Sequence, residues 1–483
     1  MRPSDDTSSE AADDPPARTD EDLAFLRERD AEENRESSLP PGEGIRIVSF
    51  TCVEIYTPST IDKLIAGLAA LGWERPDTFN PSIPNLVDWI RSTRANPFGG
   101  AWINLGRITN EDSPPPLGGS LQAKLPDGVV AIWGELHSTT PSITCLVMQF
   151  VLDEETSRTL EHIFETEFAT RTERVHSGWR YFGPMQQRMD QVRTERQRLR
   201  SICHRWISER LPGVFSSGVA TAGMPTVETF VCDLAKPFDR QDYKGFNDYR
   251  VALDIDNDSD AYESPQLAGW RLSAWGARAP DEPFVLRLGA RWTDVNDDEL
   301  SKYGSSIYSA LASRLTHPLF AFSTRFALHC LCRGYEEHLS DIRDRIASVR
   351  RHGGDVEDRD VETLYQLVTD TSYDARVVAF EMSEFCSNER RFRHVGADFS
   401  PVANWRREYE PSLVELLRNS TLSRAESIVP SEATARDSIS NLASVMTSTI
   451  NLRVGRAVFR LTWIAVVAGI LALVVAIIAL FLA

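Results

Sequence analysis

Two strand-like segments that lie close together in the sequence carry arginines beside a tryptophan. They read GWRLSAWG (269–276) and FVLRLGARW (284–292). If the segments pair as a hairpin, side-chain alternation directs one face to the core and leaves four residues on the other: Arg271, Trp275, Arg287 and Arg291. Guanidinium groups beside an indole suit phosphates, carboxylates or nucleotides. This face is therefore a candidate site for a small anionic ligand, although a charged solvent face of an edge hairpin explains the same residues.

No other segment combines chemical groups at a spacing typical of catalysis. The acidic run DIDNDSDAYES starts at Asp254 like a calcium loop, but Ser259 stands where that loop needs glycine and Pro265 where it needs glutamate. The sequence also lacks a phosphate-binding Gly-Lys-Ser/Thr loop, a dinucleotide fingerprint and a Gly-x-Ser-x-Gly elbow. We therefore predict no catalytic residues, no metal site and no cofactor, and whether the chain is an enzyme stays open.

The charge balance argues against nucleic acid as a partner. The chain has 70 acidic and 52 basic residues and a net charge of −18, whereas a phosphate-binding surface needs a local basic excess. Residues 1–43 hold 14 acidic residues and 5 arginines, so they supply half of the net charge. This composition predicts a disordered acidic tail over residues 1–43. The seven cysteines form no spaced framework, which favours reduced thiols in a cytoplasmic region.

The pattern of apolar residues between the tail and residue 430 predicts an α+β fold. Residues 44–183 alternate strand and helix signals and are expected to form a first α+β unit, a largely antiparallel sheet with covering helices. Residues 184–316 start with one long helix at Pro184, followed by strand signals of a second α+β unit. Residues 317–430 are predicted to be helical. Residues 431–460, beyond the last proline, predict a stalk helix that continues into the C-terminal segment.

The C-terminal segment is long and apolar enough to cross a membrane. Residues 461–483 carry no charge and would form a helix of about 34 Å, compared with a hydrocarbon core of roughly 30 Å. Three arginines precede it: Arg453, Arg456 and Arg460. By the positive-inside tendency, the N-terminal region faces the cytoplasm. The chain is rich in arginine and poor in lysine, which is typical of GC-rich prokaryotic genomes. We therefore expect a single-pass tail anchor in the inner (plasma) membrane of a prokaryote.

Small residues in this segment recur at intervals of 4, 3, 4, 3 and 4. They are Ala465, Gly469, Ala472, Ala476, Ala479 and Ala483. Small residues on one face let helix backbones approach closely in lipid, so the stripe predicts a homo-oligomer. The alternative is that alanine is simply abundant in such genomes.

The residues that enter the membrane segment resemble a known family. The stretch NLRVGRAVFRLTWIAVV, Asn451 to Val467, together with the α+β region and stalk before it, is similar to the CorA-type magnesium transporters. That family also has a second membrane helix and a Gly-Met-Asn loop, which this sequence lacks, so its ion filter is carried over to no residue here. We expect a membrane-anchored protein whose cytoplasmic region binds a protein partner or a small anionic ligand. The alternatives are a CorA-like or pore-forming oligomer that conducts ions, and an enzyme of unrecognised type.

Overall fold

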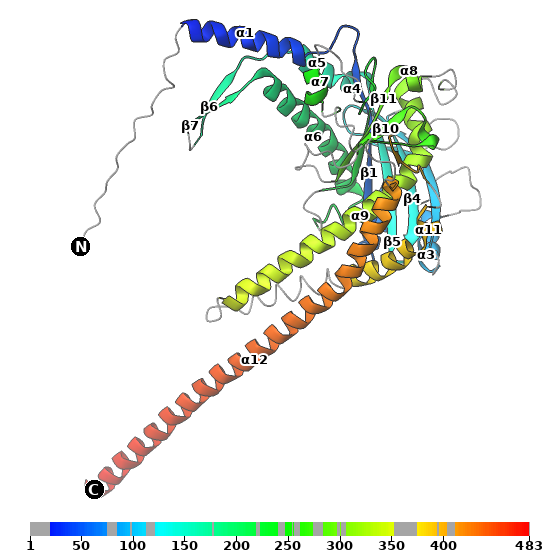
Figure 1. The fold of residues 1–483 in the computed structure, drawn as a ribbon. Coiled ribbons are helices and arrows are strands. Elements are labelled where there is room, and N and C mark those ends of the chain that lie inside the picture. The colour runs from blue at the N-terminus through cyan, green and yellow to red at the C-terminus, as the bar shows by residue number, and fades with distance from the viewer. Residues whose placement is uncertain are drawn as a thin grey trace. The chain divides into compact units, whose positions relative to one another are not determined.

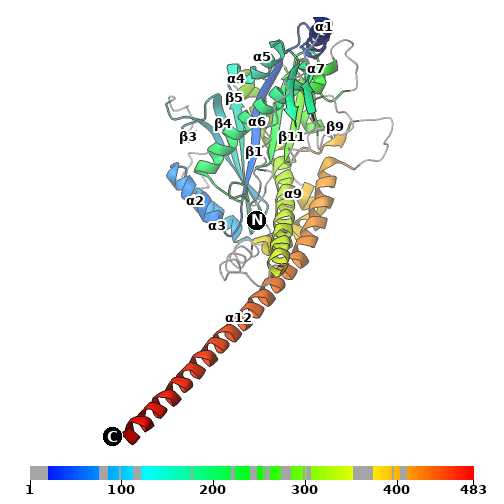
Figure 2. The same cartoon turned by 90° about the vertical axis from the view of Figure 1, so that its left-hand side faces the viewer.

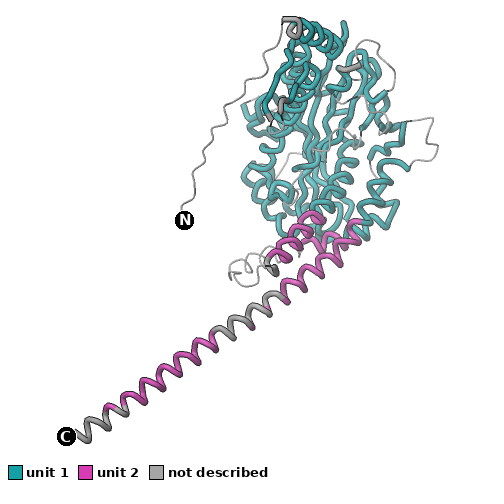
Figure 3. The backbone as a smooth tube through the Cα atoms, turned by 60° about the vertical axis from the view of Figure 1, so that its left-hand side comes forward, with its two compact units in different colours: residues 1–334, 381–423 teal, residues 335–380, 424–483 magenta. Residues whose placement is uncertain are grey.

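The computed structural model of this chain describes residues 20–74, 85–96, 99–112, 121–175, 178–218, 223–239, 247–253, 255, 261–273, 284–296, 300, 306–351, 374–393, 396–402 and 411–482. The chain divides into two compact units (Figure 3). Unit 1 comprises residues 1–334 and 381–423, and unit 2 comprises residues 335–380 and 424–483.

Unit 1 is built on one ten-stranded sheet (Figures 1 and 2). The strand order is β12-β9-β10-β11-β8-β1-β5-β4-β2-β3. All neighbours pair antiparallel except β8 with β11 and β2 with β3, which confirms a mainly antiparallel α+β fold. The strands are β1 (Ile45–Tyr56), β2 (Ala101–Asn110), β3 (Leu121–Ala123), β4 (Val129–Thr140), β5 (Ile143–Leu152), β8 (Thr226–Cys232), β9 (Ala261–Glu263), β10 (Trp270–Ser273), β11 (Val285–Arg291) and β12 (Ser400–Pro401).

The central strands join the two halves that the sequence analysis assigned to separate α+β units. Strand β1 pairs with β5 on one side and with β8 on the other, with Ile45 opposite Cys232. Strand β8 in turn pairs in parallel with β11. Strands β5 and β8 are buried at every position, because they are covered on both faces. Most of their side chains are apolar, and the buried polar ones have partners, such as Gln149 with Ser49 and Glu228 with Arg196. The boundary expected between residues 183 and 184 therefore does not separate two sheets.

Helix α6 (Pro184–Arg210) covers one face of the sheet (Figures 1 and 2). It starts with a proline in its first turn, as the sequence predicted. Its Arg196 forms an ion pair with Glu228 and lies 5.8 Å from the Phe230 ring centroid, two neighbouring positions on the same face of β8. Trp206 of α6 also contacts Phe150 of the sheet, with ring centroids 5.8 Å apart.

The opposite face of the sheet is approached by α9 (Ile307–Arg351), whose residues 307–334 belong to unit 1. Its Arg325 lines a cavity together with His137 of β4, a side chain on the face away from α6. Residues 374–387 are also helical. The remaining elements of unit 1 are α2 (Ile61–Ala70), α3 (Leu86–Arg94), α4 (Glu154–Ser157), α5 (Thr159–Glu165), β6 (Arg171–Val175), β7 (Gly178–Phe182), α7 (Asn247–Ala252), η1 (Pro265–Leu267), α8 (Trp292–Val295) and α11 (Glu389–Arg393).

Part of the expected acidic tail is a helix, α1 (Asp20–Ser37), which corrects the prediction of disorder over residues 1–43 for these 18 residues. The Asp30 carboxylate accepts a hydrogen bond of 2.7 Å from the Thr170 amide. The Asn34 side chain donates to the Phe168 carbonyl at 2.6 Å and accepts from its amide at 3.0 Å. Composition did not predict this helix because polar contacts with a distant segment, rather than an apolar face, hold it. Residues 1–19 lie outside the described residues.

Helix α12 (Leu413–Leu482) is continuous over 70 residues, so the predicted stalk and C-terminal segment form one helix (Figure 1). It begins before the stalk start expected at residue 431 and passes through Pro430, whose carbonyl accepts a hydrogen bond of 2.8 Å from the Thr434 hydroxyl. In unit 2, α12 packs against the second part of α9. Ser427 donates to Glu336 at 2.9 Å, and a cavity of about 690 Å³ lies between the two helices.

Candidate functional site

The arginines that sequence reasoning placed on one hairpin face do share a face. Strands β10 and β11 pair antiparallel, with Arg271 opposite Gly289 and Ser273 opposite Arg287. Since residues two apart along a strand point to the same side, Arg271, Arg287 and Arg291 lie on one face. Trp275 lies outside the described residues, as does most of the acidic run from Asp254.

Two of these three arginines already contact protein carboxylates. Arg271 is only 9% exposed and pairs with Asp239 at 3.1 Å. Arg291 pairs with Asp294 at 2.7 Å, three residues along the chain. These contacts neutralise part of the positive charge, which is the behaviour of a structural ion-pair network. Anion binding at Arg271, Trp275, Arg287 and Arg291 stays a prediction.

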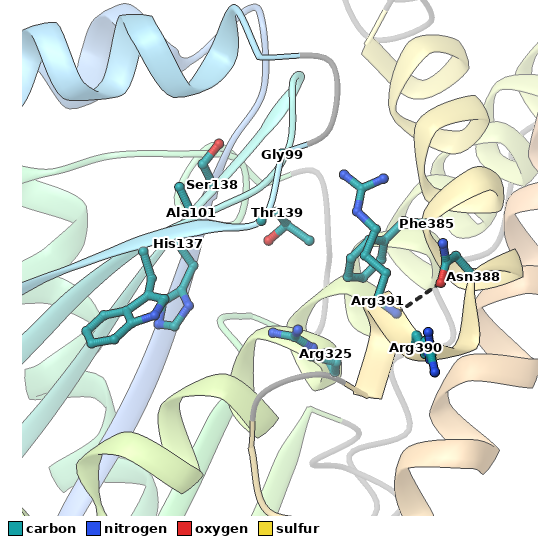
Figure 4. A pocket seen from close by; sticks show the side chains of 12 residues that line it. Gly99, Ala101, His137, Ser138, Thr139, Arg325, Phe385, Asn388, Arg390 and Arg391 are labelled. Atoms are coloured by element: carbon teal, nitrogen blue, oxygen red, sulfur yellow. Dashed lines mark hydrogen bonds between the residues drawn. The ribbon is translucent and has the colours of Figure 1, made fainter.

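A second group of basic side chains lines a cavity of about 370 Å³ within unit 1 (Figure 4). It lies where the start of β2 and the end of β4 meet α9 and the segment from residue 385 to α11. We call it the basic pocket. Its lining residues are Gly99, Gly100, Ala101, Trp102, His137, Ser138, Thr139, Arg325, Phe385, Asn388, Arg390 and Arg391.

Arg325 places a buried positive charge in the wall of the basic pocket. It is 9% exposed. Its guanidinium donates to the Phe392 carbonyl at 3.1 Å and to the Thr324 hydroxyl at 2.7 Å, so its orientation is fixed by neutral acceptors. Burial lowers the pKa of Arg325 to about 10, which still leaves the group charged at neutral pH.

Arg391 extends from α11 across the pocket toward Gly99 and Thr139 (Figure 4). A Cβ added to Gly99 would stand 2.9 Å from Arg391 Nη2, so this nitrogen lies against the glycine backbone. Nη2 is buried and has no hydrogen-bond acceptor among the described residues. The Arg391 and Arg325 guanidinium carbons lie 5.5 and 5.7 Å from the centroid of the same ring, that of Phe385.

The sheet side of the basic pocket carries aromatic groups. The His137 ring nitrogen Nε2 forms a hydrogen bond of 2.9 Å with Glu135, and both side chains are buried. Burial lowers the pKa of His137, and the Glu135 carboxylate opposes that shift. Trp102 is 46% exposed, and its ring centroid is 5.5 Å from that of His317 on α9. The pocket thus combines fixed positive charge with an accessible indole.

The predicted membrane segment belongs to α12. Over Val454–Ala472, a stretch of 19 residues, the helix has a mean hydropathy of 1.7 and no buried residue, so it is apolar enough to span a membrane. Arg456 and Arg460 lie exposed in its first turns. In the stripe of small residues, Ala465, Gly469 and Ala472 are exposed. The side chains of Arg453, Ala476 and Ala479, and all of Ala483, lie outside the described residues.

The described part of the chain contains no group of three or more His, Cys, Asp or Glu residues placed to hold a metal ion. No protein-family model matches the chain, and no curated protein is detectably similar to it. Sequence reasoning missed the basic pocket because its residues come from segments between 99 and 391 that only the fold brings together. The adjacent arginines Arg390 and Arg391, directly before Phe392, were the local sequence signal that could have drawn attention to the pocket.

Proposed function

We propose that this chain is a C-terminally anchored, single-pass membrane protein whose N-terminal region faces the cytoplasm and binds a small anionic ligand or a protein partner. The observation that carries the proposal is the exposed apolar stretch of α12, Val454–Ala472. Its 19 residues correspond to roughly 28 Å of helix, close to the thickness of a hydrocarbon core. A stretch this long, with large side chains such as Phe459, Ile464 and Leu471 at least 60% exposed, is unfavourable in water and favourable in lipid.

The orientation is supported by the charges on the N-terminal side of the uncharged residues 461–483. Arg453, Arg456 and Arg460 precede the uncharged residues 461–483. Long arginine side chains at the start of a membrane helix extend toward the lipid headgroups, and such residues are enriched on the cytoplasmic side. The inner (plasma) membrane is the membrane that this topology and the prokaryotic composition favour.

Self-association through α12 is part of the proposal. Among the described residues, nothing lies within 4 Å of where a Gly469 side chain would start, so no described contact requires glycine there. Together with Ala465 and Ala472 it offers a surface on which a second helix backbone could approach closely.

Cell fractionation of two lengths of chain tests the proposal. The full chain should pellet with membranes, and a version that ends at Arg460 should stay in the supernatant. In spheroplasts the N-terminal region should resist added protease, and in inverted membrane vesicles it should be cleaved. Recovery of the full chain in the supernatant would exclude the anchor, and cleavage in spheroplasts would exclude the cytoplasmic orientation.

An ion-conducting oligomer is the second candidate. It is supported by the resemblance of residues 451–467 to the CorA-type transporters and by the unbroken course of α12 through Pro430. Ion flux into liposomes that contain the purified chain would favour it, and liposomes as tight as protein-free ones would favour the anchored binding protein.

A further inference from the structure

The basic pocket holds arginines that pair with no carboxylate among the residues that the structure describes. Arg325 is buried and Arg391 is half-buried, and within the described residues neither forms an ion pair with a carboxylate. Arg390, at the same pocket, is exposed. Withdrawing a cation from water without a counter-charge is costly, so such groups are normally paired or bind an anion. The pocket contrasts with the hairpin face, where Arg271 and Arg291 already have carboxylate partners.

One donor in the pocket is positioned but unused. Arg391 Nη2 is buried without an acceptor in the part of the chain that the structure describes, although a buried donor without a partner is unfavourable. Gly99 and Thr139 line the cavity next to it (Figure 4). A small rotation of the Arg391 side chain, away from the Gly99 backbone and into the cavity, would let an oxygen atom of a bound anion satisfy this nitrogen.

The two guanidinium groups favour phosphate among anions. They lie about equally far from the Phe385 ring centroid but come from different helices, so a single ligand that contacts both needs several acceptor oxygens pointing in different directions. A phosphate group offers three such oxygens, whereas a carboxylate offers two in one plane.

The shape of the pocket indicates the rest of the ligand. Its volume of about 370 Å³ exceeds the needs of a bare ion and falls in the range of small-molecule sites. Trp102 is 46% exposed in its wall, and a planar ring stacked on this indole would cover the exposed surface.

We propose that the basic pocket binds a small phosphorylated molecule that carries a planar ring, with the phosphate at Arg325 and Arg391 and the ring against Trp102. This inference rests on the proposed ligand-binding function of the cytoplasmic region. It adds an anion site in the pocket between the sheet, α9 and α11, separate from the one predicted on the β10–β11 face.

Calorimetric titration of the full chain in detergent micelles tests it, with adenosine monophosphate, ribose 5-phosphate and adenosine as probes. Adenosine monophosphate should bind most tightly, ribose 5-phosphate more weakly, and adenosine not measurably. Arg391→Gln should weaken nucleotide binding at least about tenfold, because a charge-assisted hydrogen bond is lost. Arg393→Gln is the matched control: Arg393 is on the same helix but pairs with Glu389 and Glu415 and does not line the pocket, so its binding should equal that of the unchanged chain.

Equal binding of adenosine and its monophosphate, unchanged affinity in Arg391→Gln, or no binding of any probe would overturn the inference. Trp102→Ala gives a readout that does not depend on Arg391. It should abolish the preference for the nucleotide over ribose 5-phosphate, and an unchanged preference would contradict the stacking. Membrane pelleting of each variant from lysed cells, before detergent is added, keeps the two proposals distinguishable, since the anchor and the pocket can each fail while the other holds.

Discussion

Removing one partner of the buried ion pair between Arg196 and Glu228 should lower the free energy of unfolding more than removing one partner of any exposed ion pair on α6. The side chains are 2% and 0% exposed, and Arg196 Nε lies 2.9 Å from Glu228 Oε1. At an effective dielectric constant of about 20, two unit charges at this distance attract by about 6 kcal/mol. Desolvation of both groups offsets much of that attraction, but a single substitution leaves the other charge buried and unmatched. We therefore expect Glu228→Gln to lower the free energy of unfolding by about 3–5 kcal/mol.

Urea unfolding of the full chain in detergent, followed by tryptophan fluorescence, measures this loss. The double variant Arg196→Met with Glu228→Met should recover a large part of the stability, because an apolar pair of similar volume needs no counter-charge. Arg198→Gln is the control on the same helix: its pair with Glu195 is half exposed and should contribute less than about 1 kcal/mol. A loss below about 1 kcal/mol in Glu228→Gln, or additive losses in the double variant, would refute the reasoning.

Three further predictions concern the pocket and the membrane helix. Gly99→Ala should destabilise the chain by about 2–4 kcal/mol in thermal melts, because its φ is +54° and an added Cβ would stand 2.6 Å from the Thr139 carbonyl oxygen. Gly100→Ala is the control: its φ is +81° but its Cβ would meet open space, so the loss should be only about 1 kcal/mol. Burial lowers the pKa of His137 in the folded chain, so the unfolded chain binds a proton first as the pH falls below 6.5, and the free energy of unfolding should decline there. The free energy of unfolding of His137→Asn should decline less over the same pH range. Identical pH profiles for the two chains would contradict this. Gly469→Ile should remove cross-linked dimers in native membranes while Ala468→Ile retains them, and equal bands from both would leave the small-residue stripe without a role.

Local patterns in the sequence predicted the helices and the core strands well. Pro184 marks the start of α6, and the apolar run from Ile45 forms the buried strand β1. The continuity of the stalk with the apolar C-terminal segment was also predictable, since no helix breaker separates them. Each of these features depends on residues within one turn or one strand of each other.

Features that depend on distant pairing were not predictable. No local pattern in α6 distinguishes its buried arginines, Arg188, Arg196 and Arg200, from its exposed ones. Arg196 is buried because Glu228, 32 residues further on, provides its counter-charge. The single sheet and the basic pocket also depend on contacts between distant residues. No local pattern shows that β1 pairs with β8 or that residue 99 lies beside residue 391.

Extraction of membranes with alkaline carbonate tests the central claim most directly, because it releases proteins held at the surface and retains those that span the bilayer. The claim is that the apolar stretch of α12 crosses a membrane. The account predicts that the full chain stays in the pellet at high pH, while a chain that ends at Arg460 does not reach the pellet at all. Release of the full chain into the carbonate supernatant would show that α12 does not cross a bilayer.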